Sequence, residues 1–185
     1  SGGSEAQWGM LHQNLTSGKN IFLQTTSAEG TYSNKIKSME STTFTVNVSD
    51  ASAGRYNRSG ETYISYVFSE VEGYSKFGKY YGNSNSDGVF IYLGFRPAFL
   101  ITRRIDSGDH WILKDNKRNT FNDVYLNLLP NDLGSEFGSD DNSQAADFVS
   151  NGVKIRGSDS GINSQNGTYI YLAFAESPFK YSRAR

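Results

Sequence analysis

The sequence lacks several residue types, and each absence excludes a class of protein. It contains no cysteine, so neither a disulfide framework nor a thiolate metal site can form. Its 18 basic and 19 acidic residues give a net charge of −1, and no run of like charge supplies the basic surface that binds nucleic-acid phosphates. No apolar stretch approaches the roughly 18–20 residues of a membrane span. We therefore expect no nucleic-acid partner and no membrane insertion.

What the chain does contain favours β-structure. Its 185 residues include 12 tyrosines, 12 phenylalanines and 19 glycines, but only three prolines and two methionines. Aromatic side chains suit pleated sheets, while glycine, asparagine and serine supply turns. The first residues, 1–6, resemble neither a signal peptide nor a strand, and we interpret them as a linker or cloning scar.

The C-terminal part of the sequence matches an earlier part in four windows that occur in the same order. The longest match sets residues 62–70 (TYISYVFSE) over residues 168–176 (TYIYLAFAE) without a gap. The other windows pair residues 44–46 with 153–155, residues 21–24 with 124–127, and Trp8 with Trp111. The offset stays between 103 and 109 residues, which a few short loop insertions explain. The sequence therefore predicts an internal repeat, with equivalent surroundings for the matched segments.

The matches divide the chain into a partial first repeat, residues 7–73, and a second repeat, residues 74–185. The first repeat lacks a counterpart of roughly residues 75–110. Either the missing strands lie upstream in a longer parent, or the folded unit crosses the repeat boundary. The join at 71–79 is itself aromatic, so we expect the two parts to form one continuous β domain.

Short strands separated by polar turns are expected along the whole chain. Residues 44–48 alternate apolar and polar side chains, while 62–69 and 168–175 are apolar on both faces, as in a central strand. Further strands are expected near residues 7–12, 20–25, 89–94, 98–105, 110–114, 122–128 and 152–156. One helical turn is expected within 143–150. The fold class predicted is all-β, an antiparallel sandwich or jelly roll.

Candidate metal and catalytic residues are few. Asn83, Asn85 and Asp87 have the opening spacing of a calcium loop, but Gly94 stands where a bidentate glutamate belongs, so a polar hairpin turn is the simpler interpretation. Asp140 and Asp141 are weak oxygen-rich candidates in a polar loop. We expect no metal and no cofactor.

Acid–base chemistry has one candidate pair. Glu70 and Glu176 each end the matched segment, and two carboxylates can suffice for glycoside hydrolysis. The repeat explains both without catalysis. His12 and His110 are not equivalent in the repeat, and no nucleophile motif is present. We expect that the chain is not an enzyme.

The aromatic excess is the remaining functional signal. Exposed aromatic rings stack on sugars, and the candidates for ligand binding are Tyr56, Tyr74, Tyr80, Tyr81 and Trp111. The alternative for each of them is packing in the core, because the chain is poor in other large apolar residues.

Several motifs of the second repeat resemble a domain of tailed-bacteriophage structural proteins. They are residues 78–83 (GKYYGN), 87–88 (DG), 93–101 (LGFRPAFLI), 103–106 (RRID), Trp111, 151–153 (NGV), 161–164 (GINS) and 168–179 (TYIYLAFAESPF). The sequence departs from the family pattern at two positions. The family usually has threonine where this sequence has Tyr81, and it has proline after the Asp-Gly where this sequence has Val89. The resemblance implies a virion protein of the tail or tail fibre, often present as tandem copies near lectin-like domains.

The leading hypothesis is therefore a non-catalytic virion module that contributes structure and attaches to host-surface glycan. Its partners would be a host polysaccharide or receptor, together with further copies of itself or neighbouring tail-protein domains. The alternatives are a purely architectural spacer or oligomerisation repeat, and a polysaccharide-degrading enzyme.

Overall fold

A computed structural model describes residues 7–32, 36–46, 56–57, 60–138 and 143–177. The expected linker at 1–6 and the weak metal candidates Asp140 and Asp141 lie outside the described residues. Within these ranges, no helix has the length and apolarity needed to cross a membrane.

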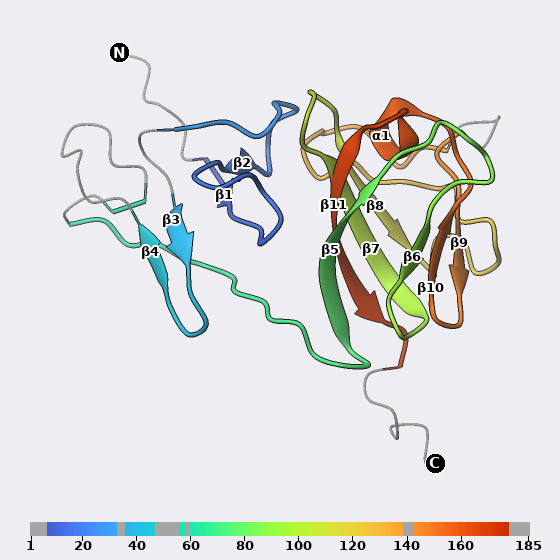
Figure 1. Cartoon of the computed structure of the whole chain (residues 1–185), viewed down its shortest axis with the longest axis horizontal. Coiled ribbons are helices and arrows are strands. Elements are labelled where there is room, and N and C mark those ends of the chain that lie inside the picture. The colour runs from blue at the N-terminus through green and yellow to red at the C-terminus, as the bar shows by residue number, and fades with distance from the viewer. Residues whose placement is uncertain (1–6, 33–35, 47–55, 58–59, 139–142, 178–185) are drawn as a thin grey trace.

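Two antiparallel sheets pack face to face and form a sandwich (Figure 1). The larger sheet has the order β5-β11-β7-β8, and the smaller has the order β6-β10-β9. Their bounds are β5 Ser75–Tyr81, β6 Phe90–Tyr92, β7 Pro97–Arg104, β8 Trp111–Asp115, β9 Ala146–Val149, β10 Gly152–Ile155 and β11 Thr168–Ala175. A short helix, α1 (Ser160–Asn163), precedes β11 and is capped by the Asp159 carboxylate. The predicted all-β antiparallel sandwich is confirmed.

Strand β11 lies between β5 and β7 and is covered on both of its faces. Tyr169 and Ala173 face the smaller sheet, where they join a core that includes Phe148 and Val153. Ile170, which alternates with them, faces the opposite side. This arrangement explains why residues 168–175 carry apolar side chains at nearly every position, and it confirms the prediction of a central, doubly buried strand there.

The described residues that precede β5 are called the N-terminal segment, and their first part covers the outer face of the larger sheet. It contributes two short strands, β1 (Gly9–Met10) and β2 (Ile21–Phe22), which pair with each other. Ile21 is fully buried against a second apolar cluster that contains Ile101, Trp111 and Ile170. Consequently, the larger sheet is the middle of three layers (Figure 1).

A separate hairpin, β3 (Ile36–Met39) and β4 (Phe44–Val46), lies beyond β1 and β2 (Figure 1). From β4 the chain returns to β5 through residues 60–74, which follow a long extended path. This path includes residues 62–69, for which the sequence predicts a buried central strand.

That prediction is wrong. Within the described part of the chain no strand pairs with residues 62–70, and their side chains are exposed. The surroundings of 62–70 and 168–176 therefore differ, as do those of Trp8, which is half exposed, and Trp111, which is buried. An apolar pattern specifies which faces a strand can bury, but a strand forms only beside partner strands, and none lies beside 62–69.

The remaining predicted elements are a mixture of confirmations and corrections. Strands occur as expected within 89–94, 98–105, 110–114 and 152–156. The helical turn expected within 143–150 is wrong, because residues 146–149 form β9 and pair with β10. The stretch 122–128 makes only isolated bridges, since it passes from the edge strand of one sheet to that of the other: Val124 bridges to Ala146 of β9, and Leu128 bridges to Leu113 of β8.

Candidate functional site on the β5–β6 side

Two of the five aromatic residues predicted to bind a ligand are part of the core. Tyr80 on β5 stacks on Tyr169 with ring centroids 4.9 Å apart, and its hydroxyl donates a hydrogen bond to the Ile162 carbonyl at 2.8 Å. Burial raises the pKa of its phenol well above the ordinary value. The prediction of ligand contact for Tyr80 is therefore wrong, because the side chain alternates inward from the edge strand and has no exposed face.

Trp111 at the start of β8 is also buried, beneath the N-terminal segment. Its Nε1 donates a hydrogen bond to the Phe22 carbonyl at 3.0 Å, and the buried guanidinium of Arg103 lies 5.7 Å from its ring centroid. Burial lowers the pKa of Arg103 to about 10. The ligand-binding prediction for Trp111 is wrong for the same reason as that for Tyr80.

The other three predicted residues differ in their exposure. Tyr56 is half-buried with its ring over Gly9, where any side chain would collide with it. Tyr74 is partly exposed and packs edge-on against Phe174, with centroids 6.0 Å apart. Tyr81, at the end of β5, is 56% exposed, and the Lys79 ammonium lies 5.6 Å from its ring centroid. Of the five, Tyr81 has the most open aromatic surface in this fold.

Strand β6 adds two exposed rings that are not among the five predicted aromatic residues. Phe90 and Tyr92 point outward while Ile91 between them is buried, and Tyr92 is 60% exposed. The alternation around Ile91 was the available signal, because a strand with one buried face must expose the residues on either side.

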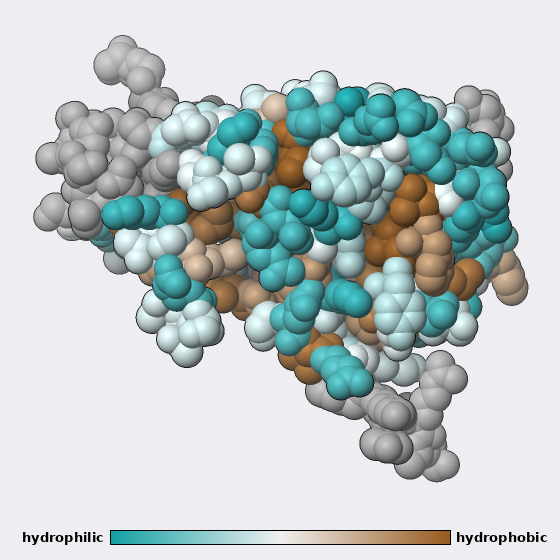
Figure 2. Space-filling model, viewed as in Figure 1, coloured by the Kyte–Doolittle hydropathy of each residue, from teal (hydrophilic) through white to brown (hydrophobic). Residues whose placement is uncertain are grey.

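Lysine side chains accompany these rings and connect the two edge strands. The Lys76 ammonium on β5 lies 5.1 Å from the ring centroid of Tyr92 on β6, so the contact bridges the two sheets. Figure 2 shows hydrophilic and hydrophobic side chains interleaved over this side of the molecule. We call the residues Lys76, Lys79, Tyr81, Phe90 and Tyr92 the β5–β6 side; Lys76 is half-buried and the other four are exposed.

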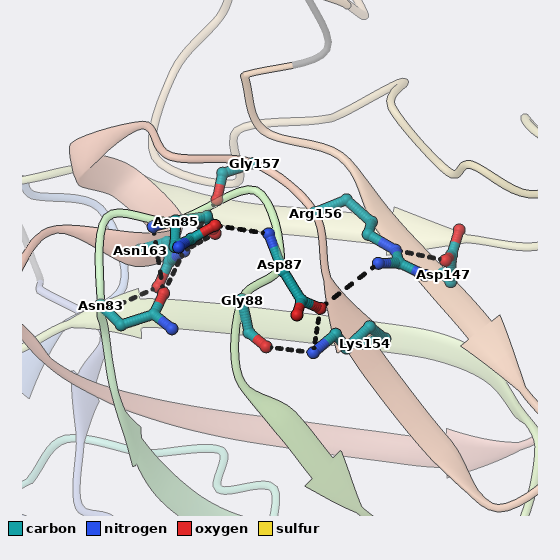
Figure 3. Close-up of polar contacts among 9 residues, drawn as sticks. All are labelled: Asn83, Asn85, Asp87, Gly88, Asp147, Lys154, Arg156, Gly157 and Asn163. Atoms are coloured by element: carbon teal, nitrogen blue, oxygen red, sulfur yellow. Dashed lines mark hydrogen bonds and ion pairs between the residues drawn. The ribbon is translucent and has the colours of Figure 1, made fainter.

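The loop that joins β5 to β6 contains the calcium-like spacing (Figure 3). The Asn163 side-chain nitrogen donates to Asn83 Oδ1 at 3.1 Å, to the Asn85 carbonyl at 2.9 Å and to the Gly157 carbonyl at 2.8 Å. An amide donor thus occupies the point where these oxygens converge. Asn163 Oδ1 accepts in turn from the Asn83 backbone N–H at 2.8 Å, so the buried Asn163 fixes the loop from inside.

The acidic residue of the loop is engaged by two basic side chains (Figure 3). Asp87 lies 2.8 Å from the Lys154 ammonium and 3.7 Å from the Arg156 guanidinium. The hydrogen bond from Lys154 lowers the pKa of the Asp87 carboxyl. The loop crosses from one sheet to the other, which corrects the hairpin expected here, and its oxygens are held by protein donors.

The two candidate catalytic glutamates form different contacts. Glu70 Oε1 accepts from the Phe77 backbone N–H at 3.0 Å, and thus joins the extended 60–74 path to β5. Glu176 forms an ion pair with Arg96 at 3.2 Å and accepts a hydrogen bond from Asn116 at 3.0 Å. Each carboxylate thus has polar partners within the fold.

The two histidines occupy unrelated positions. His12 is buried with Nε2 3.3 Å from the Tyr171 carbonyl, and burial lowers its pKa. His110 lies at the start of β8 with Nδ1 2.9 Å from the Asn131 side-chain nitrogen. Across the described ranges, no three His, Asp or Glu side chains are grouped so that they could hold a metal ion.

A family comparison covers nearly the whole chain. The profile of a family described as a domain of unknown function, DUF7483, matches residues 2–178. The chain belongs to the DUF7483 family. No curated protein and no solved structure matches it. The match spans the N-terminal segment and the sandwich together, so the DUF7483 unit includes both.

For this DUF7483 chain, the β5–β6 side presents aromatic rings next to ammonium groups. Tyr81 and Tyr92 offer aromatic faces and hydroxyl groups, and Lys76 and Lys79 offer ammonium donors. Edge strands of a packed sandwich hold these groups, with the buried Asn163 fixing the connection between them. Such a surface can stack on a flat ligand and attract an anion at the same time.

Proposed function

We propose that this DUF7483 chain is a non-catalytic structural module of a bacteriophage virion, in a tail or tail fibre, which attaches to a host-surface polysaccharide through its β5–β6 side. Support for the virion placement comes from the long motifs in residues 78–106 and 151–179 that resemble tailed-phage structural proteins. The proposed ligand follows from the chemistry of the exposed side chains.

The observation that carries the proposal is the exposure of Tyr81 and Tyr92 on edge strands, each beside a lysine. A tyrosine that is more than half exposed contributes little to folding, yet it gives a large and rigid contact surface for a ligand. The ammonium groups of Lys76 and Lys79 add positive charge next to the rings. We therefore infer that the preferred polysaccharide is acidic, with carboxylate, phosphate or pyruvate groups.

The test is binding of the fluorescently labelled chain to a panel of bacterial cells and purified acidic and neutral polysaccharides. Saturable binding to an acidic polymer is expected, and it should weaken with added salt because exposed charges are screened. Tyr92→Ala and Tyr81→Ala should each weaken binding at least about tenfold, equivalent to about 1.4 kcal/mol.

The matched control is Phe121→Ala, which removes an exposed aromatic ring outside the β5–β6 side. This variant should bind like the parent protein. Equal losses for Phe121 and the two tyrosines, or no saturable binding by folded protein, would reject the attachment proposal. Release of reducing ends from a bound polysaccharide would reject its non-catalytic part.

A purely architectural role is the second candidate, and one observation favours it. Residues 64–68 leave apolar side chains exposed on an extended path outside the sandwich. Exposed apolar surface of this kind marks contact with another polypeptide more often than contact with a sugar.

A further inference from the structure

The apolar side chains exposed in the N-terminal segment are concentrated in three places, which are a single residue, a hairpin and an extended stretch. One is Trp8, another is the β3–β4 hairpin with Met39 and Phe44, and the third is the extended stretch 64–68. Trp8 also stacks on Tyr66 of that stretch, with ring centroids 6.3 Å apart. We call these three the open elements.

The extended stretch has a buried counterpart in the same chain. Residues 62–70 match 168–176 without a gap, which sets Ile64 over Ile170 and Val67 over Ala173. Ile64 is 65% exposed and Val67 is 69% exposed, whereas both counterparts are fully buried in β11. The sequence is that of a central strand, but among the described residues no strand pairs with either of its edges.

The hairpin has a counterpart as well, and the register agrees at the two residue pairs nearest its turn. Met39 pairs with Phe44 in β3–β4, and Phe148 pairs with Val153 in β9–β10, each at an offset of 109 residues. The next pairs inward, Ser38 with Thr45 and Asp147 with Lys154, keep this offset. The two hairpins therefore agree in the two residue pairs nearest their turns, and they differ farther from the turn, where β3 has a register shift between Ile36 and Ser38 that β9–β10 lacks.

The difference between the two hairpins lies in what covers them. Phe148 and Val153 are buried in the sandwich core, while Met39 and Phe44 are each more than 40% exposed. Strand β6 pairs with the outer edge of β10, whereas β4 has β3 as its only strand partner among the described residues.

One set of strands accounts for the strand pairings that 62–69 and β4 lack. In the sandwich, β11 is flanked by β5 and β7, and β10 is flanked by β6. These three strands are consecutive in the chain, and the N-terminal segment has no sequence counterpart of them. Without β5, β6 and β7, β11 would have no partner on either edge and β10 would lose the partner on its outer edge, as 62–69 and β4 do among the described residues.

We infer that the open elements are the docking site for a three-stranded polypeptide unit of the β5–β6–β7 sequence type, which completes a second sandwich on the N-terminal segment. In this arrangement residues 62–69 become a central strand, with a β5-like strand on one edge and a β7-like strand on the other. A β6-like strand adds to the free edge of β4. The inference concerns assembly and does not depend on polysaccharide binding.

The partner's chemistry follows from the contacts that its counterpart makes in the sandwich. Leu100 of β7 lies opposite Ala173, so the partner should carry an apolar residue opposite Val67. Ile91 of β6 lies opposite Val153, so it should place another apolar residue opposite Phe44. Backbone pairing would supply the affinity, and these side chains would fix the register.

The test supplies the partner strands from this chain itself. Residues 74–110 are duplicated and joined directly before Trp8, which reproduces the junction between residues 110 and 111 in the sandwich. In the extended protein, amide hydrogens of residues 62–69 should exchange at least about 100-fold more slowly than in the original chain, as befits a central strand. Binding of a hydrophobic fluorescent dye should fall at the same time.

A control fusion carries Leu100→Ser and Ile101→Ser in the added copy only, and it should leave 62–69 unprotected. In the original chain, Val67→Lys should leave the thermal midpoint unchanged because Val67 is exposed, whereas in the fusion it should remove the protection. Together these variants separate failed folding from failed docking.

Two outcomes would overturn the inference. Exchange at 62–69 that is as fast in the folded fusion as in the original chain would show that β5–β7-type strands do not dock there. Protection of 62–69 that appears in the original chain with rising concentration, together with a dimeric mass by light scattering, would assign the site to a second copy of this chain instead.

Discussion

The dependence of stability on pH between about 7.5 and 9.5 should be set by one buried lysine. Lys114 on β8 points into the core between the sheets, where its ammonium lies 3.1 Å from the Val124 carbonyl and 2.5 Å from Asn127 Oδ1. Burial lowers the pKa of Lys114 from 10.5 to about 7, and the nearby Asp123 carboxylate only partly offsets this effect.

The sign of the effect follows from proton binding. In the unfolded chain Lys114 keeps a pKa near 10.5, so between about pH 7.5 and 9.5 the unfolded state holds a proton that the folded state has released. Stability therefore rises with pH in this window, by up to about 1.4 kcal/mol per pH unit and by about 2.5 kcal/mol overall. The penalty for burying the amine is complete below pH 7 and disappears above about pH 10.5.

Other shifted groups act outside this window. Burial raises the pKa of Tyr169 and Tyr171 to about 12, so these residues affect stability only above about pH 10, where they lower it as pH rises. The lowered pKa of His12 acts below about pH 6.5. The interval from 7.5 to 9.5 thus isolates Lys114.

The assay is urea unfolding, followed by tryptophan fluorescence, at pH 7.5, 8.5 and 9.5. The parent protein should gain stability across the series, while Lys114→Met, which keeps the side-chain volume but cannot ionise, should be nearly flat. Lys79→Met, at an exposed position on β5, should retain the parental slope. A slope that is the same in the parent and Lys114→Met would refute the reasoning.

Two further predictions concern buried hydrogen bonds, and urea unfolding at pH 8 measures both. Asn163→Ala removes three donated bonds and one accepted bond at a buried site, so it should lower the free energy of unfolding by at least about 3 kcal/mol. Its control is Gln165→Ala, at an exposed position just after α1, which should change the free energy of unfolding by less than about 0.5 kcal/mol. Trp111→Phe should cost about 2–3 kcal/mol, because the Phe22 carbonyl loses its donor and a cavity opens, whereas Trp8→Phe should be nearly neutral. Equal costs at the two tryptophans would contradict the packing described for them.

The fold class could be predicted from the sequence because its main signal is local. Residues 168–175 are apolar on both faces, and they form a strand that is buried on both sides between two neighbours. The same reasoning applied to 62–69 gave a wrong strand, although the two stretches have a similar apolar pattern. Burial of a central strand depends on residues 75–104 folding beside it, and a single stretch of sequence carries no information about its neighbours.

The candidate site was predictable only in part. Tyr81 was singled out and is exposed, but Tyr80 beside it is buried, and the two residues differ only in which way an edge strand turns them. Tyr92 was overlooked although its strand was expected, because the position of Ile91 in the core was not used to orient its neighbours. Aromatic composition indicates that some rings are available, while the inward or outward direction depends on which face of each strand meets the other sheet.

The 83–88 loop shows why a metal-like spacing is ambiguous at short range. Asparagine and aspartate at alternate positions direct oxygens toward one point, and either a cation or an N–H donor can neutralise such a point. Here the donor is Asn163, 80 residues away from Asn83 in sequence, and it reaches the loop because α1 leads into β11 beside β5. The Asp87 carboxylate is likewise held by Lys154 and Arg156, from the end of β10 and just beyond it. Since the group that meets these oxygens comes from a distant strand connection, only the tertiary structure distinguishes a cation-binding loop from one that is closed by the protein's own amide.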